Sequence, residues 1–550
     1  MAYLGLLAMN RLYYGDNLHI MQNKMLHEQV DLIYLDPPFN SARYYNMIYT
    51  DITGNPIPEQ ALAFADTWEM SAEQETMARK MPVLMQEYGV DELYIEIWRI
   101  WMNALRKTYS PLLAYLLYMV ERLLIMKWIL KPTGSIYLHC DPTASHYIKI
   151  MMDGIFGQDN FRNEIIWERT KAKGDAQRKF AWNHDVLLAY SFGNKYTFNP
   201  VFAAKTEEYE SRFGLDDNDG RGPYHSAPLD SPSIRPNLTY EYKGYKPPAK
   251  GWRVSLEEMK RLDADDRLIF PKDKNGRIRR KLYASEQLGP KVGDVWTDIA
   301  PLQASRGSGT KSERFDYPTQ KPIALLKRII EASSNEGDTV FDPFCGCGTT
   351  IYAAHLTKRN WIGCDIAMPA IQIVQDALRD RYFLEKDKHY MVDGIPITVE
   401  QAEVLFNASP TSFQNWIVEA VKGVPSTKKS GDGGIDGRIW FFDENKDMQC
   451  MVLSVKGGHI KPADIRDLRG VLEREDSAHM AGFLSLNEPT KAMKQEAAQA
   501  GIYECDGESY QRMQLLTAQQ ILEEGKTFMM PKRVRIGSKA ASKQHTLFGS

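Results

Sequence analysis

Residues 339–350 read TVFDPFCGCGTT, a short apolar strand that runs directly into a glycine-rich turn and a helix. Glycine in such a turn lets a ligand approach the backbone and leaves amide N–H groups pointing outward. The next apolar run, NWIGCDI (360–366), ends at Asp365, about 20 residues on, where a carboxylate can bind ribose hydroxyls. The turn has neither GxxxxGK(S/T) nor the third glycine of GxGxxG. It therefore predicts a site for a cofactor that has a ribose and no phosphate.

Two further apolar runs are expected to be buried strands. DLIYLDPPFN (31–40) ends in a double-proline turn, and GSIYLHCDP (134–142) follows a Pro-Thr-Gly turn. Strands that alternate with helical segments favour an α/β fold. In such a sheet ligands bind at the carboxyl ends of the strands, so the residues that follow these runs are candidates for a site.

Asp36, Pro37, Pro38 and Phe39 form the most informative short motif of the chain. The nitrogen of an aromatic amine is a poor nucleophile, because its lone pair is delocalised into the ring. A carboxylate oxygen of Asp36 and the carbonyl of Pro37, whose φ is fixed, can accept the amino hydrogens and draw the nitrogen toward sp³ geometry. Phe39 offers a ring on which an extruded base can stack, worth about 1–3 kcal/mol. The motif indicates methylation of an exocyclic amine, with an ordinary Asx-Pro turn as the alternative.

Length and composition indicate several domains and no membrane segment. A chain of 550 residues exceeds one ordinary core, and its 43% hydrophobic and 25% charged residues are typical of soluble proteins. The net charge of -3 allows a local basic face for nucleic acid. Residues 112–130 are apolar but contain Glu121, Arg122 and Lys127, so a core helix is expected there. Six cysteines without a CxxC pair favour a reduced setting, cytoplasmic and nucleoid-associated.

Together the motifs resemble the β class of amino-methylating DNA methyltransferases, in which the catalytic turn precedes the recognition region and the cofactor turn follows it. The resemblance implies a doubly wound, mostly parallel methyltransferase sheet in permuted motif order. It also implies direct methyl transfer from S-adenosyl-L-methionine to N6 of an adenine flipped out of double-stranded DNA. Aspartate at position 36 favours adenine where serine would favour cytosine, so N4 of cytosine is the alternative. The motifs are YYGDN (13–17), DLIYLDPPFNS (31–41), LKPTGSIYLHCDPTASHY (130–147), FRNEIIW (161–167), YPTQKP (317–322), DPFCGCGTT (342–350) and GCDI (363–366).

The resemblance gives the matching residues their expected roles. Asp36 to Phe39 form the catalytic turn, and Lys321 is a natural partner for a carboxylate. Tyr317 stands where the family usually has histidine. This difference is expected to have little effect, because the later residues of YPTQKP make the contacts. The expected cofactor-binding residues are Asp342, Phe344, Gly346 and Gly348 at the methionine part, Asp365 at the ribose, Asp16 at the adenine, and Thr319 and Lys321 at the carboxylate.

Composition divides the chain into five parts. Residues 169–300 are rich in Gly, Pro, Asn and Tyr and lack clean periodicity. They are expected to form an irregular target-recognition insert between a catalytic half, 1–168, and a cofactor-binding half, 301–393. A further domain at 394–530 and a flexible tail at 531–550 follow. The basic cluster of the insert is a candidate phosphate contact or a solvated charged face: Arg277, Arg279, Arg280 and Lys281.

SGDGGIDGRIWFF (430–442) and QCMVLSVKGG (449–458) resemble the α/β restriction-endonuclease-like fold of the Mrr type, whose acids and lysine surround a divalent metal. Asp436, the expected metal ligand, and Lys456 match that pattern, and Glu419 lies on the preceding helix. Ser454 stands where Glu or Gln is usual and is a poorer Mg²⁺ ligand. Either the chain methylates DNA and also cuts it with Mg²⁺, or the domain only binds DNA; the second reading is favoured.

The last residues suggest a partner. Gln544, Leu547 and Phe548 in QHTLF resemble the short peptide with which bacterial proteins dock onto the replication sliding clamp, although such a pattern often arises by chance. A catalytically silent scaffold, or methylation of RNA or protein, is disfavoured by the intact DPPF turn and the large insert. The recognition sequence, a partner subunit and the oligomeric state stay open, and a dimer is compatible with the sequence.

Overall fold

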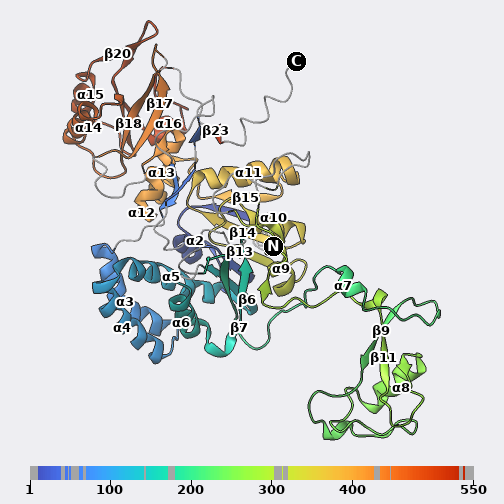
Figure 1. Cartoon of the computed structure of the whole chain (residues 1–550). Coiled ribbons are helices and arrows are strands. Elements are labelled where there is room, and N and C mark those ends of the chain that lie inside the picture. Colours follow the sequence, from blue (N-terminus) through green and yellow to red (C-terminus); the bar gives the residue numbers. More distant parts are fainter. Residues whose placement is uncertain are drawn as a thin grey trace, which may run out of the picture. The chain divides into compact units, whose positions relative to one another are not determined.

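The computed structural model describes residues 10–38, 44–47, 49–50, 61–65, 70–140, 144–170, 180–302, 313, 320–426, 434–445, 447–531 and 537–538. The chain divides into two compact units (Figure 1). The first combines Met1–Asn199 with Asp294–Ser550, and the second is Pro200–Gly293. The predictions for Phe39, Thr319 and the tail peptide at 544–548 lie outside the described residues.

A nine-stranded sheet forms the centre of the first unit, in the order β12-β7-β8-β6-β2-β13-β14-β1-β15. β8 runs antiparallel to β6 and β7, and the other neighbouring strands pair in parallel. The expectation of a large, mostly parallel α/β sheet is therefore confirmed. The strands are β1 Asn10–Tyr14, β2 Val30–Leu35, β6 Leu130–Cys140, β7 Phe161–Glu168, β8 His184–Ser191, β12 Val295–Trp296, β13 Thr339–Asp342, β14 Asn360–Asp365 and β15 Tyr390–Asp393.

The central strands are apolar throughout because helices cover the sheet on both faces. All six residues of β2 are buried, as expected for a strand of a covered parallel sheet. Figure 1 shows α3 to α6 on one side of these strands and α9 to α11 on the other. The helices are α2 Asn17–Lys24, α3 Ala72–Glu87, α4 Glu92–Thr108, α5 Ser110–Ile129, α6 Ser145–Phe156, α9 Ile323–Ser333, α10 Thr349–Leu356 and α11 Met368–Tyr382.

Helix α5 is the apolar run for which a core helix was expected. Its leucines, including Leu113, Leu116 and Leu123, are buried in the main hydrophobic core together with residues of α3, α4 and α6. Among the helices that the structure describes, none has the length and apolarity to cross a membrane. The six cysteines are buried, and none of them forms a disulfide.

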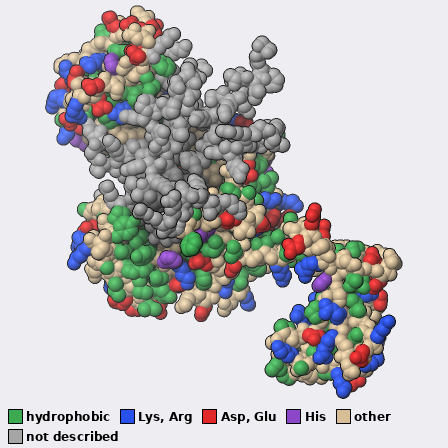
Figure 2. Space-filling view, viewed as in Figure 1, with side chains coloured by type: hydrophobic (Ala, Val, Ile, Leu, Met, Phe, Trp, Pro, Cys, Tyr) green, Lys and Arg blue, Asp and Glu red, His purple; other side chains and the backbone are tan. Residues whose placement is uncertain are grey.

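The unit Pro200–Gly293 has a small core of its own around Leu229, Trp252, Met259 and Ile278. Two strands within the insert expected at 169–300, β8 and β12, belong to the central sheet instead. This unit is therefore shorter than the expected insert. In the view of Figure 2, its Lys and Arg side chains alternate with Asp and Glu. Its elements are α7 Glu207–Glu210, β9 Tyr224–Pro228, α8 Leu256–Ala264, β10 Leu268–Ile269 and β11 Arg279–Tyr283, with sheet order β10-β11-β9.

A second sheet follows in the C-terminal part, in the order β16-β17-β18-β19-β22. β16, β17 and β18 pair antiparallel, and β18, β19 and β22 pair in parallel. The strands are β16 Val424–Pro425, β17 Gly437–Phe442, β18 Met448–Lys456, β19 Ala478–Ser485 and β22 Met513–Thr517. The helices are α12 Val399–Ala408, α13 Pro410–Ala420, α14 Pro462–Arg474, α15 Lys491–Ala498 and α16 Ala518–Leu522.

Three strand pairs complete the described structure. β20 (Ile502–Cys505) pairs with β21 (Glu508–Gln511) as a hairpin beyond α15. β3 (Tyr44–Met47) pairs with β5 (Ala61–Ala65), and β4 (Tyr49–Thr50) pairs with β23 (Gly537–Ser538). These pairs lie outside the two larger sheets.

Candidate functional site

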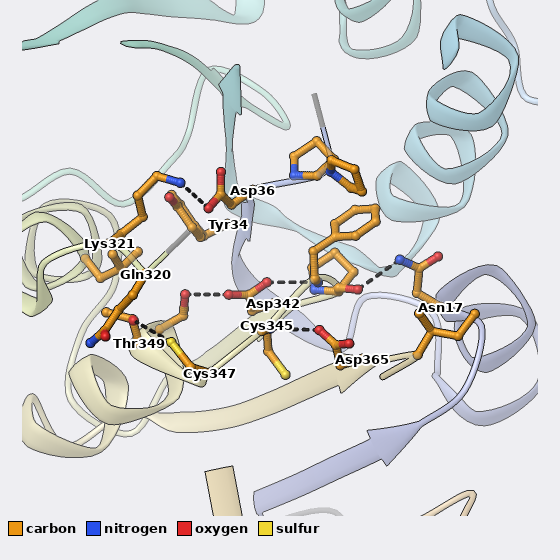
Figure 3. A pocket seen from close by; sticks show the side chains of 18 of the residues that line it. Asn17, Tyr34, Asp36, Gln320, Lys321, Asp342, Cys345, Cys347, Thr349 and Asp365 are labelled. Carbon is orange, nitrogen blue, oxygen red and sulfur yellow. Dashed lines mark hydrogen bonds and ion pairs between the residues drawn. The ribbon is translucent and has the colours of Figure 1, made fainter. Parts of the chain in front are cut away.

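One pocket lies where β1, β2, β13 and β14 end (Figure 3). These strands run in parallel, so their carboxyl ends reach the same edge of the sheet and bring together side chains from distant parts of the chain. The pocket is lined by residues of both the predicted catalytic turn and the predicted cofactor turn, and Gly348 is not among these lining residues. Its lining includes Asp16, Asn17, Tyr34, Asp36, Pro37, Pro38, Tyr118, Gln320, Lys321, Asp342, Phe344, Gly346 and Asp365.

The glycine-rich turn between β13 and α10 is held by the carboxylate of Asp365. Gly346 N donates to Asp365 Oδ2 at 2.8 Å, and Ala367 N donates to Oδ1 at 2.9 Å. Burial raises the pKa of Asp365 to about 6, against the lowering effect of these backbone donors. The turn that ends β13 and the strand end of β14 are therefore joined directly at the pocket.

Asp342, the last residue of β13, is a second buried acid in this pocket. It accepts hydrogen bonds from Phe344 N at 2.9 Å and from the Thr350 hydroxyl. Burial raises its pKa to about 7; these two donors lower the pKa, and nearby Asp36 and Asp365 raise it further. A buried acid that is close to half ionised at neutral pH favours a cationic group beside it.

Asp16 is the N-cap of α2 and is also tied to helix α5. Its Oδ1 accepts from Leu18 N at 2.9 Å, and its Oδ2 lies 2.9 Å from Arg122 Nη2. Arg122 also donates from Nε to Asn17 Oδ1 at 2.6 Å, and its guanidinium lies 3.3 Å from the centre of the Tyr118 ring. Sequence reasoning treated Arg122 only as an interruption of an apolar helix, but its charge organises one wall of the pocket.

The catalytic turn follows β2, and the Asp36 carboxylate forms an ion pair with the Lys321 ammonium. Both side chains are largely shielded, with 15% of Asp36 and 12% of Lys321 exposed. Lys321 is expected at the carboxylate of the cofactor, and in this structure its ammonium also contacts Asp36 of the predicted catalytic turn. Pro37 and Pro38 line the pocket beside them.

Tyr34 and Gln320 are pocket residues that the motif comparison did not single out. Tyr34 on β2 precedes Asp36, the first residue after that strand, by two positions, and residues two apart in extended backbone lie on the same side. That alternation is the signal that could have identified Tyr34. Gln320 directly precedes Lys321 and gave no comparable signal.

The basic cluster of the smaller unit is largely engaged within that unit. Lys281 is 6% exposed and bonds Asp217 and Asp266, while Arg279 donates to Ser226. Arg277 lies 3.5 Å from Asp230 and stays about half exposed. Lys281 therefore holds this unit together and is not available to DNA. Among these residues, the exposed Arg277 remains the candidate for a phosphate contact.

The candidate nuclease residues are brought together only in part. Asp436 Oδ2 accepts from Val455 N at 2.6 Å, which puts this acid beside the strand that ends at Lys456. Glu419 on α13 is partly buried, which raises its pKa to about 8, and its charge adds to burial in raising the pKa of the Tyr14 phenol. Within the described ranges, which leave out 427–433, no three His, Cys, Asp or Glu residues are grouped to hold a metal.

Comparison with known proteins agrees with this geometry. Residues 30–376 match the family N6_N4_Mtase, described as DNA methylase. The type II methyltransferase M.EcaI of Enterobacter cloacae is 34% identical over 265 residues, which are 48% of this chain and 56% of that protein. The StyLTI Mod subunit, from a type III restriction-modification enzyme of Salmonella typhimurium (strain LT2), is 26% identical over 351 residues, 62% of this chain and 48% of that protein.

A solved structure from Thermus thermophilus, a putative DNA modification methylase complexed with S-adenosyl-L-methionine, is 13% identical with a TM-score of 0.32. It covers 70% of this chain and 97% of its own. This chain spans about half the length of the curated relatives it matches. The family match takes in well over half of the chain, from β2 and the turn at Asp36 through the cofactor turn and Asp365. The chain therefore belongs to the N6_N4_Mtase family of DNA methylases.

Proposed function

We propose that this protein transfers a methyl group from S-adenosyl-L-methionine to an exocyclic amino group of double-stranded DNA, at N6 of adenine. One observation carries the proposal: Asp36 and Pro37 line the same pocket as Gly346, Asp342 and Asp365. Direct methyl transfer requires the target amine and the cofactor to be bound next to each other, and a shared pocket allows this. Membership of the DNA methylase family supports the same activity.

The cofactor fits the donors and acceptors of the pocket. Asp365 would accept hydrogen bonds from the ribose hydroxyls, and the buried Asp342 would face the cationic amino group. Phe344, Gly346 and Gly348 would surround the methionine part, Asp16 the adenine, and Lys321 with Thr319 the carboxylate. Bound in this way, S-adenosyl-L-methionine supplies an electrophilic methyl group on a sulfonium.

The residues of this chain would prepare the target nitrogen. The Asp36 carboxylate and the Pro37 carbonyl accept the two amino hydrogens, so the nitrogen lone pair is turned out of conjugation and toward the methyl group. A paired base cannot offer this amino group, so the base has to leave the duplex, where Phe39 would stack on it. No covalent bond between protein and base is needed.

Adenine is the proposed target and cytosine N4 is the second candidate. Sequencing modified bases in DNA from cells that express the protein separates the two and reports the recognition sequence. N6-methyladenine at one recurrent sequence is expected, N4-methylcytosine would transfer the proposal to the other base, and unmodified DNA would overturn it. The compact unit Pro200–Gly293 is the proposed reader of that sequence.

Cofactor affinity is expected to depend on pH through Asp342. A cationic amino group favours the ionised form of this acid, whose pKa is raised to about 7 by burial. Binding below that pH must release a proton, so affinity should fall by up to about tenfold for each pH unit below 7 and level off above it. Titration calorimetry with S-adenosyl-L-methionine at several pH values measures this. Asp342→Asn should bind weakly with little pH dependence, and a flat wild-type profile would contradict the assignment.

For the C-terminal domain we propose DNA binding in a restriction-endonuclease-like fold rather than cleavage. The pairing of Asp436 with Val455 N beside Lys456 favours the fold, whereas Ser454 offers only a hydroxyl to a metal. Unmodified plasmid incubated with the protein and Mg²⁺ should remain intact, both with wild type and with Lys456→Ala. Cleavage by wild type that Lys456→Ala abolishes would show an active Mg²⁺-dependent nuclease instead.

The tail peptide Gln544, Leu547 and Phe548 is proposed to bind the sliding clamp. A glutamine that hydrogen-bonds and a Leu-Phe pair that fills an apolar pocket give this peptide the chemistry for docking. Pull-down of the clamp with and without residues 540–550 tests this partner, and unchanged clamp binding would contradict the proposal.

A role in restriction and modification follows from the DNA methylase family and the proposed target.

A further inference from the structure

A chain of buried polar side chains crosses three strands of the central sheet beside the catalytic turn. The Tyr34 hydroxyl on β2 lies 2.9 Å from His139 Nδ1 on β6. His139 Nε2 lies 3.1 Å from Asp185 Oδ2 on β8. All three residues are buried, with relative exposures of 2%, 0% and 2%. These groups form one continuous path from β2 to β8.

The direction of the hydrogen bonds follows from the acid at the end of the path. The pKa of Asp185 is lowered: burial opposes this, but the hydrogen bond and charge of His139 outweigh it, with help from Lys321 and Arg169. An ionised carboxylate only accepts, so His139 donates from Nε2. The relay requires the neutral imidazole, in which Nδ1 is the acceptor and takes the hydrogen of the Tyr34 hydroxyl while Nε2 donates to Asp185. A proton that reaches the Tyr34 oxygen can therefore be passed to His139.

The two ends of this path meet different surroundings. Tyr34 lines the pocket that contains Asp36, and Figure 3 shows the two side chains next to each other. At the other end, Asp185 Oδ1 lies 3.2 Å from Nε of Arg169, whose side chain is 45% exposed. The path thus leads from the proposed reaction site toward the surface. A buried ionised acid is costly to hold in a sheet that apolar side chains could fill, which favours a functional role over packing.

Methylation of an amine also requires a proton acceptor. The nitrogen that gains a methyl group becomes positively charged and must release one proton in every turnover. Asp36 is the carboxylate proposed to bind the amine, but its charge is already engaged by the Lys321 ammonium, and its oxygens are needed to hold the amino hydrogens. Asp36 can therefore position the amine without being the group that finally takes the proton.

We propose that Tyr34, His139 and Asp185 form a relay that accepts the proton released by the methylated amine. The proposal rests on the methyl transfer proposed above. The N–H bond of the methylated amine breaks as its proton moves to the Tyr34 oxygen, and the original Tyr34 proton moves to His139 Nδ1. The products are a neutral methylamino base, a neutral tyrosine and an imidazolium that the Asp185 carboxylate stabilises. No oxidant, reductant or further reactant is needed.

The surroundings of His139 are consistent with an imidazolium. Tyr34 and Asp185 face its two nitrogens, and the Trp167 ring on β7 packs edge-on at 5.9 Å between ring centres. Further charges act through these partners: Asp36 and Asp342 act on Tyr34, and Lys321 and Arg169 act on Asp185. Lys321 and Arg169 are cations that act on Asp185, and the acids near Tyr34 act on its phenol. Asp185 is therefore the negatively charged group in direct contact with the imidazole.

The test compares Tyr34→Phe with the wild-type protein in single-turnover methyl transfer to unmodified plasmid DNA, across a range of pH, with S-adenosyl-L-methionine saturating. Wild type should slow toward acid pH, because a relay that already holds a proton cannot accept the proton of the methylated amine. Tyr34→Phe should lower the rate about 10²-fold at neutral pH and remove that acid dependence. His139→Gln keeps an acceptor for Tyr34 but cannot take up the proton, and should behave in the same way.

A matched control is available on the neighbouring strand. The buried Tyr137 hydroxyl bonds Ser333 Oγ at 2.7 Å outside the pocket lining, so Tyr137→Phe removes a similar bond and should leave the rate and pH profile unchanged. Cofactor affinity, measured by calorimetry, should stay the same in all these variants. A wild-type rate in Tyr34→Phe, or a reduced rate with the wild-type pH profile, would overturn the relay. Absence of transfer by wild type would instead reject the proposed function.

Discussion

Asp36→Ala is expected to lower methyl transfer by about 10²–10³-fold or more and to leave cofactor binding largely intact. The substitution removes an acceptor that is aimed at the target amine, and preorganised groups of this kind contribute on that scale. Asp36 lies on the β2 side of the pocket, whereas the proposed ribose and methionine contacts come from β13 and β14. Incorporation of a tritiated methyl group into DNA measures the rate, and calorimetry measures cofactor affinity.

Asp393→Ala is the matched control for this experiment. Asp393 ends β15 at the same edge of the sheet and pairs with Arg11 at 3.1 Å, but it does not line the pocket. Its removal should leave transfer unchanged. Asp36→Asn keeps one acceptor oxygen and should fall between wild type and Asp36→Ala. Transfer by Asp36→Ala within about tenfold of wild type would remove Asp36 from the proposed role.

Gly348→Ala is the second change with a large expected effect, this time on cofactor binding and folding. Gly348 precedes α10 with a φ of +87°, and an added Cβ would lie 2.8 Å from Val374 Cγ2 and 2.9 Å from Tyr352 Cζ. Tyr352 is buried and donates to Cys347 O at 2.7 Å, so it cannot move without disturbing the turn. We expect at least about tenfold weaker cofactor binding and a loss of about 3 kcal/mol in the free energy of unfolding.

Gly337→Ala separates crowding from backbone strain in that experiment. Gly337 lies just before β13 with nearly the same φ, +88°, but an added Cβ would meet nothing within 4 Å. It should cost only the left-handed strain of about 1–2 kcal/mol and leave cofactor affinity unchanged. Urea denaturation reports stability and calorimetry reports affinity. If both variants bind the cofactor equally well, cofactor binding does not depend on the conformation of the turn at Gly348.

Much of the site could be predicted from the sequence because its residues follow strands. The strands before Asp36, Asp342 and Asp365 are continuous apolar runs, and parallel strands bring their carboxyl ends to one edge whatever separates them in the chain. The alternation of strands and helices likewise identified the mostly parallel sheet. The roles of the individual residues stay predictions until the variants are measured.

Other features depend on tertiary contacts that leave little trace in a motif. Arg122 stands in an apolar helix, and its partner Asp16 is more than 100 positions away. The expected insert began at residue 169 because its composition was judged as a whole. The eight residues HDVLLAYS within it form β8, which joins the central sheet. Spacing in the sequence could not show whether Asp436 and Glu419 belong to one metal site, and no group of metal-binding residues is found among the described residues.

The pairing of β2 with β13 has a consequence for biosynthesis. Leu32 and Ile33 pair with Val340 and Phe341, about 300 residues later in the chain, while the partner on the other side, β6, is complete by Cys140. At about 5–20 residues per second, a ribosome needs roughly 10–40 s to make the about 200 residues between Cys140 and Val340. During that time an apolar strand has an open edge to which other chains can bind. Exposure to aggregation during synthesis is therefore the cost of a sheet in which β13 is made after all the strands on the β2 side of it.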